Sequence, residues 1–387
     1  MNIQKAKRLD NVKEYYFSTK IQEIAQIEKS GEKVINLGIG NPDNPPHSDV
    51  LNVLVSESKN IYNHGYQNYR GIDELRKAFA DWCRKYYKIE LDHSTEVLPL
   101  MGSKEGIMHI SMAYLNEGVT VLIPNPGYPT YSSVSELCGA NIIKYDLIEE
   151  NGWLPDIESL ERMNLENVKI MWINYPHMPT GASISIDKLR EVVQFSQRNN
   201  ILLVNDNPYS FILNDKHVSI FNIEGAKENC LELNSLSKVH NMAGWRVGML
   251  TGNETHINNV LKIKSNMDSG MFKPIQLAAC KALSLEESWY CNLNLMYAKR
   301  KVIAHKIMDV IGAKYSNEST GMFIWARIPD KYADAEVLCK MLLKRTRVFI
   351  TPGFIFGENG RKYIRISLCN SESVLMEALL KISKELN

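Results

Sequence analysis

The strongest constraint on the fold is an alternation, between about residues 96 and 251, of short apolar runs with longer helical stretches. The apolar runs are VTVLI from residue 119, VKIMWI from 168, ILLV from 201 and VGML from 247. In the intervening stretch IDKLREVVQFSQ, one helical face carries Ile186, Leu189, Val192 and Val193. Buried strands separated by amphipathic helices predict an α/β fold with a mostly parallel sheet covered on both faces.

The pattern changes from about residue 286. A long helical stretch, ESWYCNLNLMYAKRKVIAHKIM, is followed by the strand GMFIWARI, a second helix and the strand YIRISL. This order predicts a smaller α+β domain over residues 286–387. We expect residues 46–285 to form the large α/β domain and residues 1–45 to join the small one.

Composition narrows the possible partners. Apolar residues make up 44% of the 387 residues and charged residues 23%, which is ordinary for a globular protein with a large core. The 45 basic and 44 acidic side chains leave a formal net charge of +1 without any basic block. We therefore expect neither nucleic acid nor a membrane as a partner. The N-terminus also lacks the apolar core of a signal peptide.

The cysteines and histidines argue against a disulfide framework and a metal site. The seven cysteines are scattered and include no C-x-x-C, which predicts reduced thiols in a cytoplasmic protein. The nine histidines include no H-E-x-x-H or other paired ligand spacing. We expect no metal.

Polar clusters follow three of the predicted strands directly. VKIMWI leads into NYPHMPTG, ILLV into NDNPYS, and CLEL into NSLSK. Ligands of open α/β sheets bind at the carboxyl ends of the strands. Although each cluster alone could be an ordinary loop, together they predict that Asn174, Asp206, Tyr209 and Lys238 meet in one crevice.

The residue types in these clusters indicate a particular cofactor. A buried lysine such as Lys238 forms imines with carbonyl compounds, and pyridoxal phosphate needs such an imine. It also needs an aspartate at its ring nitrogen. The run VLPLMGSKEGIMHISMAYL reads as a strand, a Gly102 turn and a helix, an arrangement that binds anions such as phosphate. Arg246 follows close behind Lys238 and could bind the same anion.

The stretch NSLSKVHNMAGWRVG resembles the lysine motif of the class I/II aminotransferases, the fold type I pyridoxal-phosphate enzymes. Other motifs of that family appear in order, over about residues 10–385: GYQNYRGIDELRKAFADW, MGSKEG, NPGYPTY, NYPHMPTG, NDNPYS and YIRISL. The nearest branch in appearance contains the aspartate and LL-diaminopimelate aminotransferases. The resemblance implies a mostly parallel seven-stranded sheet flanked by helices, and transfer of an amino group from an L-amino acid to a 2-oxo acid.

The resemblance also implies a role for each matching residue. Lys238 would form the imine and then move the α-proton, Asp206 would pair with the ring nitrogen, and Tyr209 would bind the phenolic oxygen. The other residues implied to bind the cofactor are Ser103, Lys104, Tyr128, Asn174, Ser235, Ser237 and Arg246. Those implied to bind substrate are Arg365, which grips the α-carboxylate, with Gly38 and Tyr15.

A homodimer with composite active sites is implied by Tyr66, which matches a tyrosine that reaches the phosphate of the neighbouring subunit. Many dicarboxylate-specific relatives use a second arginine from the partner. The corresponding stretch here, KIKSNMDSGMFKPIQ, contains no arginine, only Lys262, Lys264 and Lys273. The substrate therefore stays open.

The chain departs from the family where the usual N-P-T-G reads Met178-Pro179-Thr180-Gly181. A thioether cannot donate the hydrogen bond that the asparagine gives to the phenolic oxygen. His177 or Asn174 could replace it, or the reaction could differ. The alternatives are a carbon–sulfur β-lyase or decarboxylase, a non-catalytic pyridoxal-phosphate-binding regulator, and a nicotinamide dehydrogenase supported only by GIGNPD.

Overall fold

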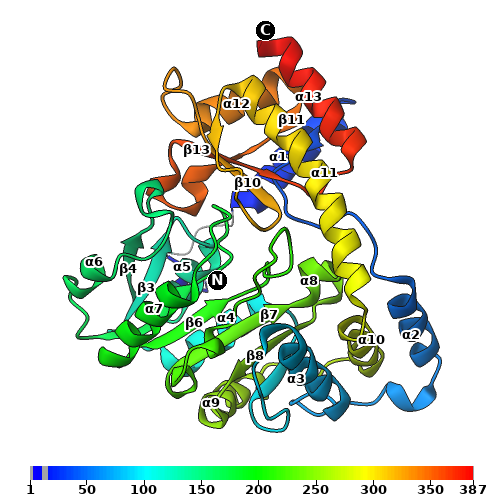
Figure 1. The fold of residues 1–387 in the computed structure, drawn as a ribbon, viewed down its shortest axis with the longest axis vertical. Helices are drawn as coiled ribbons and strands as arrows, with labels where there is room; N and C mark the ends of the chain where they lie inside the picture. Colours follow the sequence, from blue (N-terminus) through cyan, green and yellow to red (C-terminus); the bar gives the residue numbers. More distant parts are fainter. Residues whose placement is uncertain (1–2, 11–15, 387) are drawn as a thin grey trace.

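The computed structural model describes residues 3–10 and 16–386. Its largest element is a seven-stranded sheet in the order β2-β8-β7-β6-β5-β3-β4, in the lower part of Figure 1. The strands are Val97–Leu100 (β2), Thr120–Asn125 (β3), Asn141–Asp146 (β4), Val168–Ile173 (β5), Leu202–Asp206 (β6), Cys230–Ser235 (β7) and Gly248–Gly252 (β8). Neighbours from β7 to β4 pair in parallel, whereas β8 is antiparallel to both β2 and β7. The predicted mostly parallel seven-stranded sheet is confirmed.

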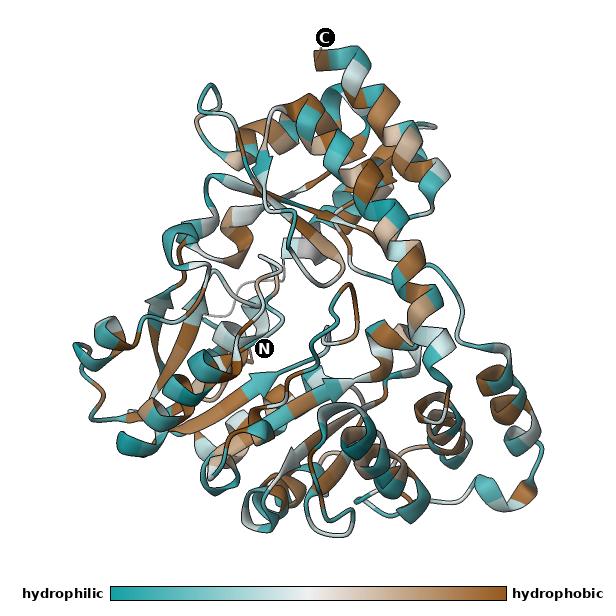
Figure 2. Cartoon of the chain, in the orientation of Figure 1, coloured by the Kyte–Doolittle hydropathy of each residue, from teal (hydrophilic) through white to brown (hydrophobic). Residues whose placement is uncertain are grey.

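Helices cover both faces of this sheet. They are Ser48–Ser58 (α2), Asp73–Tyr87 (α3), Ser103–Tyr114 (α4), Pro129–Leu137 (α5), Ile157–Glu161 (α6), Ile186–Arg198 (α7), Leu236–Val239 (α8), Glu254–Lys264 (α9) and Lys273–Leu283 (α10). The side chains of β5 alternate between two cores: Trp172 packs in the cluster of α4 and α9, and Met171 in that of α7. Figure 2 shows the apolar central strands between helices whose outer faces are hydrophilic.

A second, four-stranded sheet lies above the first in the order β12-β13-β10-β9. Its region contains Tyr16–Lys29 (α1), Ile35–Asn36 (β1), Glu287–Ile311 (α11), Lys314–Tyr315 (β9), Phe323–Arg327 (β10), Ala335–Thr346 (α12), Val348–Phe349 (β11), Thr351–Pro352 (β12), Tyr363–Ser367 (β13) and Glu372–Leu386 (α13). The long helix α11 runs along one side of both parts (Figure 1).

Strand β1 joins the N-terminal segment to the C-terminal part of the chain. It pairs in parallel with β11, placing Ile35 opposite Val348. This pairing supports the proposed assignment of residues 1–45 to the small domain, and the boundaries at 45 and 285 remain predictions. Across the described ranges, no helix is both long enough and apolar enough to cross a membrane.

Candidate active site

A cavity of about 620 Å³ opens where β5, β6 and β7 end, between the two sheets. Most of the predicted site residues line it together. They are Ser103, Lys104, Tyr128, Asn174, Asp206, Tyr209, Ser235, Ser237, Lys238, Arg246 and Arg365. The parallel strands supply three of these segments because their carboxyl ends share one edge.

Lys238 lies in the short helix α8, which begins directly after β7. The hydroxyl of Ser235 caps this helix by accepting a hydrogen bond from the amide of Ser237 at 3.2 Å. The Lys238 ammonium donates to the carbonyl oxygen of Gly40 at 2.5 Å. Burial lowers the pKa of Lys238, and the charges of Arg365 and Arg246 lower it further, against an opposing contribution from Cys369. A lowered pKa favours the neutral amine, which is the nucleophilic form.

Asp206, the last residue of β6, has one satisfied carboxylate oxygen. Its Oδ2 accepts a hydrogen bond from the Tyr131 hydroxyl at 2.9 Å. Its buried Oδ1 has no hydrogen-bond partner among the described residues. Burial raises the pKa of Asp206 to about 7, although the Tyr131 hydrogen bond opposes this. A buried carboxylate oxygen without a donor fits a ligand that brings a cationic N–H.

Tyr131 is a site residue that the sequence analysis missed. Its ring stacks on Trp172, with ring centroids 4.9 Å apart and an interplanar angle of 6°, and makes an edge contact with Tyr128. The available signal was its position one helical turn after Tyr128 in NPGYPTY, which places both rings on the same side of α5.

An anion site lies beside Lys238. Gly102 has a φ of +86°, which favours glycine, and leads into α4 without a side-chain cap, so the N-terminus of that helix begins at the cavity, an arrangement that binds anions. A Cβ on Gly102 would lie 2.1 Å from Nη2 of Arg246, so any larger residue there would displace the guanidinium. Arg246 is held by the Ala243 carbonyl at 2.9 Å and the Ser237 hydroxyl at 3.4 Å. Burial and the charge of Arg246 lower the pKa of Lys104.

These groups fit pyridoxal phosphate. The anion site matches the phosphate, Asp206 Oδ1 matches a protonated ring nitrogen, and the Lys238 amine matches the aldehyde. All three features lie in the lining of the one cavity. The fit depends on an uncapped helix N-terminus and an unsatisfied buried carboxylate oxygen, both of which are features of this chain.

Arg365 lines the same cavity from β13. Its guanidinium stacks over the rings of Phe323 and Phe356, at 4.0 and 4.7 Å from the centroids. It donates to the Gly38 carbonyl oxygen at 2.6 Å. Gly38 therefore supports the arginine, while the following residues, Ile39 and Gly40, line the cavity.

Met178 contacts Arg365, with 3.3 Å between its sulfur and Nη1 of the guanidinium. Asn174 lines the cavity, but its amide oxygen accepts from the Met178 amide at 2.8 Å and its amide nitrogen donates to the Asp206 carbonyl. His177 bonds Thr180 at 2.8 Å and lies outside the described lining of the cavity. Burial lowers the pKa of His177 to about 3. The oxygen and the nitrogen of the Asn174 amide are thus both bonded to the main chain, and His177 does not line the cavity.

Two further predicted residues do not line the cavity. Tyr66 is 93% exposed and lies on the surface between α2 and α3. Tyr15 lies outside the described residues.

One wall of the cavity was not predicted: Ser18, Ile21 and Gln22 of α1 line it. The sequence analysis assigned no functional residue to this helix.

Comparisons with known proteins identify the family of the chain. Residues 32–382 match the family described as aminotransferase class I and II. The LL-diaminopimelate aminotransferase of Dehalococcoides mccartyi is 37% identical over 380 residues, which are 98% of each chain. That of Natranaerobius thermophilus is 37% identical over 382 residues, 98% of this chain and 99% of the relative. The solved apo-BacF structure from Bacillus subtilis is 34% identical with a TM-score of 0.95, covering 100% of this chain and 99% of that one. This chain therefore belongs to the class I and II aminotransferase family and is a pyridoxal-phosphate-dependent aminotransferase.

Proposed function

We propose that Lys238, Asp206 and Tyr209 are the catalytic residues of this aminotransferase. The observation that carries the proposal is the meeting in one cavity of a lysine with a lowered pKa, a buried carboxylate oxygen without a donor, and an anion site. Bound pyridoxal phosphate supplies an electron sink that stabilises negative charge on the α-carbon of the substrate. The side chains of the chain itself supply binding, orientation and proton transfer.

Each of these side chains has a task that follows from its surroundings. Nζ of Lys238, which donates to the Gly40 carbonyl, would hold the aldehyde carbon of the cofactor and, as the free amine, would accept the α-proton of the substrate. Asp206 would hold the ring nitrogen in its protonated form. The Tyr209 hydroxyl would donate to the phenolic oxygen, a role that Met178 cannot share. Arg365, in contact with the rings of Phe323 and Phe356, would bind the α-carboxylate.

We propose LL-diaminopimelate as the first amino donor to test, because relatives 37% identical carry that name. Where dicarboxylate-specific relatives have a second arginine, this chain has three lysines. One of them, Lys264, is buried and paired with Asp268 at 2.6 Å, so its charge is already neutralised within the protein. Ile21, Gln22 and Ile39 also line the cavity and could contact the side chain of the donor. The cytoplasmic location remains a prediction.

Lys238→Ala tests the proposed function. The variant should lose amino transfer by at least roughly 10²–10⁴-fold, the usual contribution of a positioned acid–base group, and still bind cofactor through the anion site. The assay follows 2-oxo acid products from a panel of donors with 2-oxoglutarate or pyruvate, and equilibrium dialysis measures cofactor binding. Lys262→Ala, at an exposed position, is the control. Full transfer by Lys238→Ala would sink the assignment, and release of sulfide or carbon dioxide instead of transfer would favour a lyase or decarboxylase.

Asp206→Asn should stabilise the cofactor-free protein in a pH-dependent way. The carboxyl titrates near pH 7 when buried and near 3.8 when unfolded. Folding therefore binds a proton between these values, and the contribution of Asp206 to stability falls as the pH rises from about 4 to 7. The variant should gain roughly 1–4 kcal/mol in unfolding free energy at pH 8 and little at pH 4. Urea denaturation measures both, with exposed Asp330→Asn as the control; equal gains at the two pH values would contradict the prediction.

Arg365→Lys should lower kcat/KM for every amino donor by tenfold or more. A bidentate contact to the α-carboxylate is lost, and a charged hydrogen bond contributes about 1.5–3 kcal/mol. The contacts with Phe323 and Phe356 weaken as well. Initial-rate kinetics with several donors measures the effect, and exposed Arg361→Lys is the control. A loss confined to dicarboxylic donors would move Arg365 to the side-chain end of the substrate.

We further propose a homodimer in which Tyr66 reaches the phosphate site of the partner. Ile61, Tyr62 and Tyr66 are 76%, 83% and 93% exposed. Met267 and Phe272 are also exposed, and the rings of Phe272 and His64 lie 5.6 Å apart, so the two segments form one apolar surface. An apolar surface of this kind is typical of an interface between subunits.

Tyr62→Asp should dissociate the proposed dimer, because a charge would be buried in the apolar surface. Sedimentation velocity should show a dimer for the wild type and monomer for the variant, whereas Leu380→Asp, exposed on α13, should remain dimeric. Tyr66→Phe should weaken cofactor retention without changing donor preference. An active wild-type monomer at assay concentration would show that the proposed composite site is wrong.

A further inference from the structure

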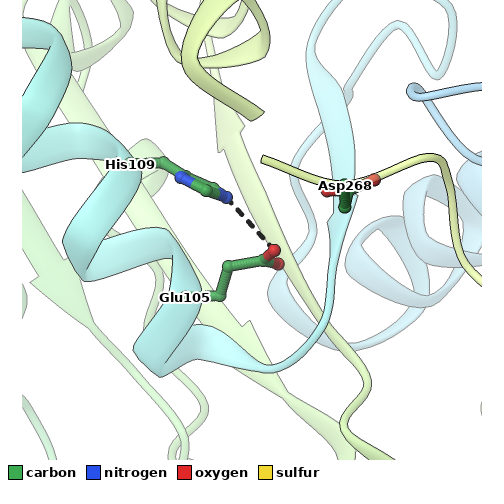
Figure 3. A group of neighbouring side chains, drawn as sticks. All are labelled: Glu105, His109 and Asp268. Carbon is green, nitrogen blue, oxygen red and sulfur yellow. Dashed lines mark ion pairs between the residues drawn. The ribbon is translucent and has the colours of Figure 1, made fainter. Parts of the chain in front are cut away.

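A cluster of charged and polar side chains, buried or partly buried, lies near the N-terminus of α4, outside the cavity lining (Figure 3). Glu105 and His109 face each other from successive turns of α4, with 3.1 Å between Oε1 and Nε2. Asp268 lies on the segment after α9, and its carboxylate, the Glu105 carboxylate and a ring nitrogen of His109 all lie within 4.8 Å of one another. Lys264 completes the cluster by pairing with Asp268 at 2.6 Å.

The same three ligand types could hold a metal ion, but the remaining contacts favour an internal network. Oε2 of Glu105 accepts a hydrogen bond from the Met101 amide at 2.5 Å. Oδ1 of Asp268 accepts from the Gly270 amide at 2.7 Å, while Oδ2 holds the Lys264 ammonium. A cation bound here would lie beside a buried ammonium group, and like charges in a poorly solvated site repel strongly.

One end of the network holds the phosphate-binding turn. Met101 precedes Gly102, whose positive φ lets the chain turn into α4 beneath Arg246. The bond from the Met101 amide to Glu105 ties the residue before Gly102 to the helix, and the carboxylate also lies in the first turn of the helix, where negative charge is favourable.

The other end of the network holds the surface segment that meets residues 61–69. Gly270 has a φ of +86°, and a Cβ there would lie 2.5 Å from the carbonyl oxygen of Gln67. Gln67 directly follows Tyr66. Glu105 thus holds the Met101 amide and Asp268 holds the Gly270 amide, the two carboxylates and His109 lie within 4.8 Å of one another, and Gly270 packs against the backbone beside Tyr66.

We propose that Glu105, His109 and Asp268 are positioning residues for the phosphate site. They hold the turn that presents the Ser103 and Lys104 amides, and they tie it to the surface segment that carries Tyr66. This inference rests on the proposed assignment of the anion site to the cofactor phosphate. It predicts that the network affects affinity for the phosphate group of the cofactor and leaves the contacts to the ring unchanged.

The test compares two ligands of the cofactor-free protein: pyridoxal phosphate, and pyridoxal, which has the same ring without the phosphate. Glu105→Gln and Asp268→Asn should each weaken binding of pyridoxal phosphate by about tenfold, as expected when a charged hydrogen bond is weakened. Binding of pyridoxal should change by less than about twofold. Glu117→Gln, at an exposed position just after α4, is the matched control.

Equal losses for both ligands, or no loss for either, would overturn the proposal. If Glu105→Gln does not fold, which circular dichroism would reveal, His109→Gln keeps both carboxylates and allows the same comparison. Arg246→Gln separates this inference from the function on which it rests. If Arg246→Gln also fails to discriminate between the two ligands, the phosphate assignment is wrong; if it discriminates and the network variants do not, only the network proposal fails.

Discussion

The parallel pairing of β5, β6 and β7 is the constraint on which the site depends. In this register Ile173 lies opposite Asn205 and Asp206 opposite Leu233, so the three strands end within a few residues of one another. Three loops that are distant in the sequence thereby deliver Asn174, Asp206 and Lys238 to a single edge. Because both faces of the sheet are packed against helices, this edge can be polar without weakening either core.

The lining of the cavity has more positive than negative side chains, which suits the binding of anionic ligands. Four cationic side chains line its described part, Lys104, Lys238, Arg246 and Arg365, against the single carboxylate of Asp206. Burial lowers the pKa values of Lys104 and Lys238, with smaller contributions from neighbouring arginines, and burial raises the pKa of Asp206. A cofactor phosphate and a substrate carboxylate would supply the missing negative charge, and a ring N–H the missing donor for Asp206.

The sequence was informative wherever a motif is contiguous. The central sheet and most of the functional residues between Ser103 and Arg246 could be predicted, because strand periodicity and short motifs are local, whereas Tyr131 was missed. Contacts between distant segments could not. Met178 touches Arg365 across 187 residues, Lys238 reaches Gly40 across 198, and Asp268 joins the α4 residues Glu105 and His109. The wall formed by α1 was missed for the same reason, since an amphipathic pattern does not say which surface the helix faces.

The reversed strand β8 has a consequence for how the site assembles. β7 ends at the edge of the sheet that carries the site. Because β8 is antiparallel to β7, with Ser235 opposite Gly248, β8 begins at that same edge. The short connection between them carries both Lys238 and Arg246. Closing a loop of this length costs little entropy, and contacts of low sequence separation form readily during folding. The spacing between the amine and the guanidinium is therefore a local property of one strand pair, which the long-range packing of the two sheets need not establish.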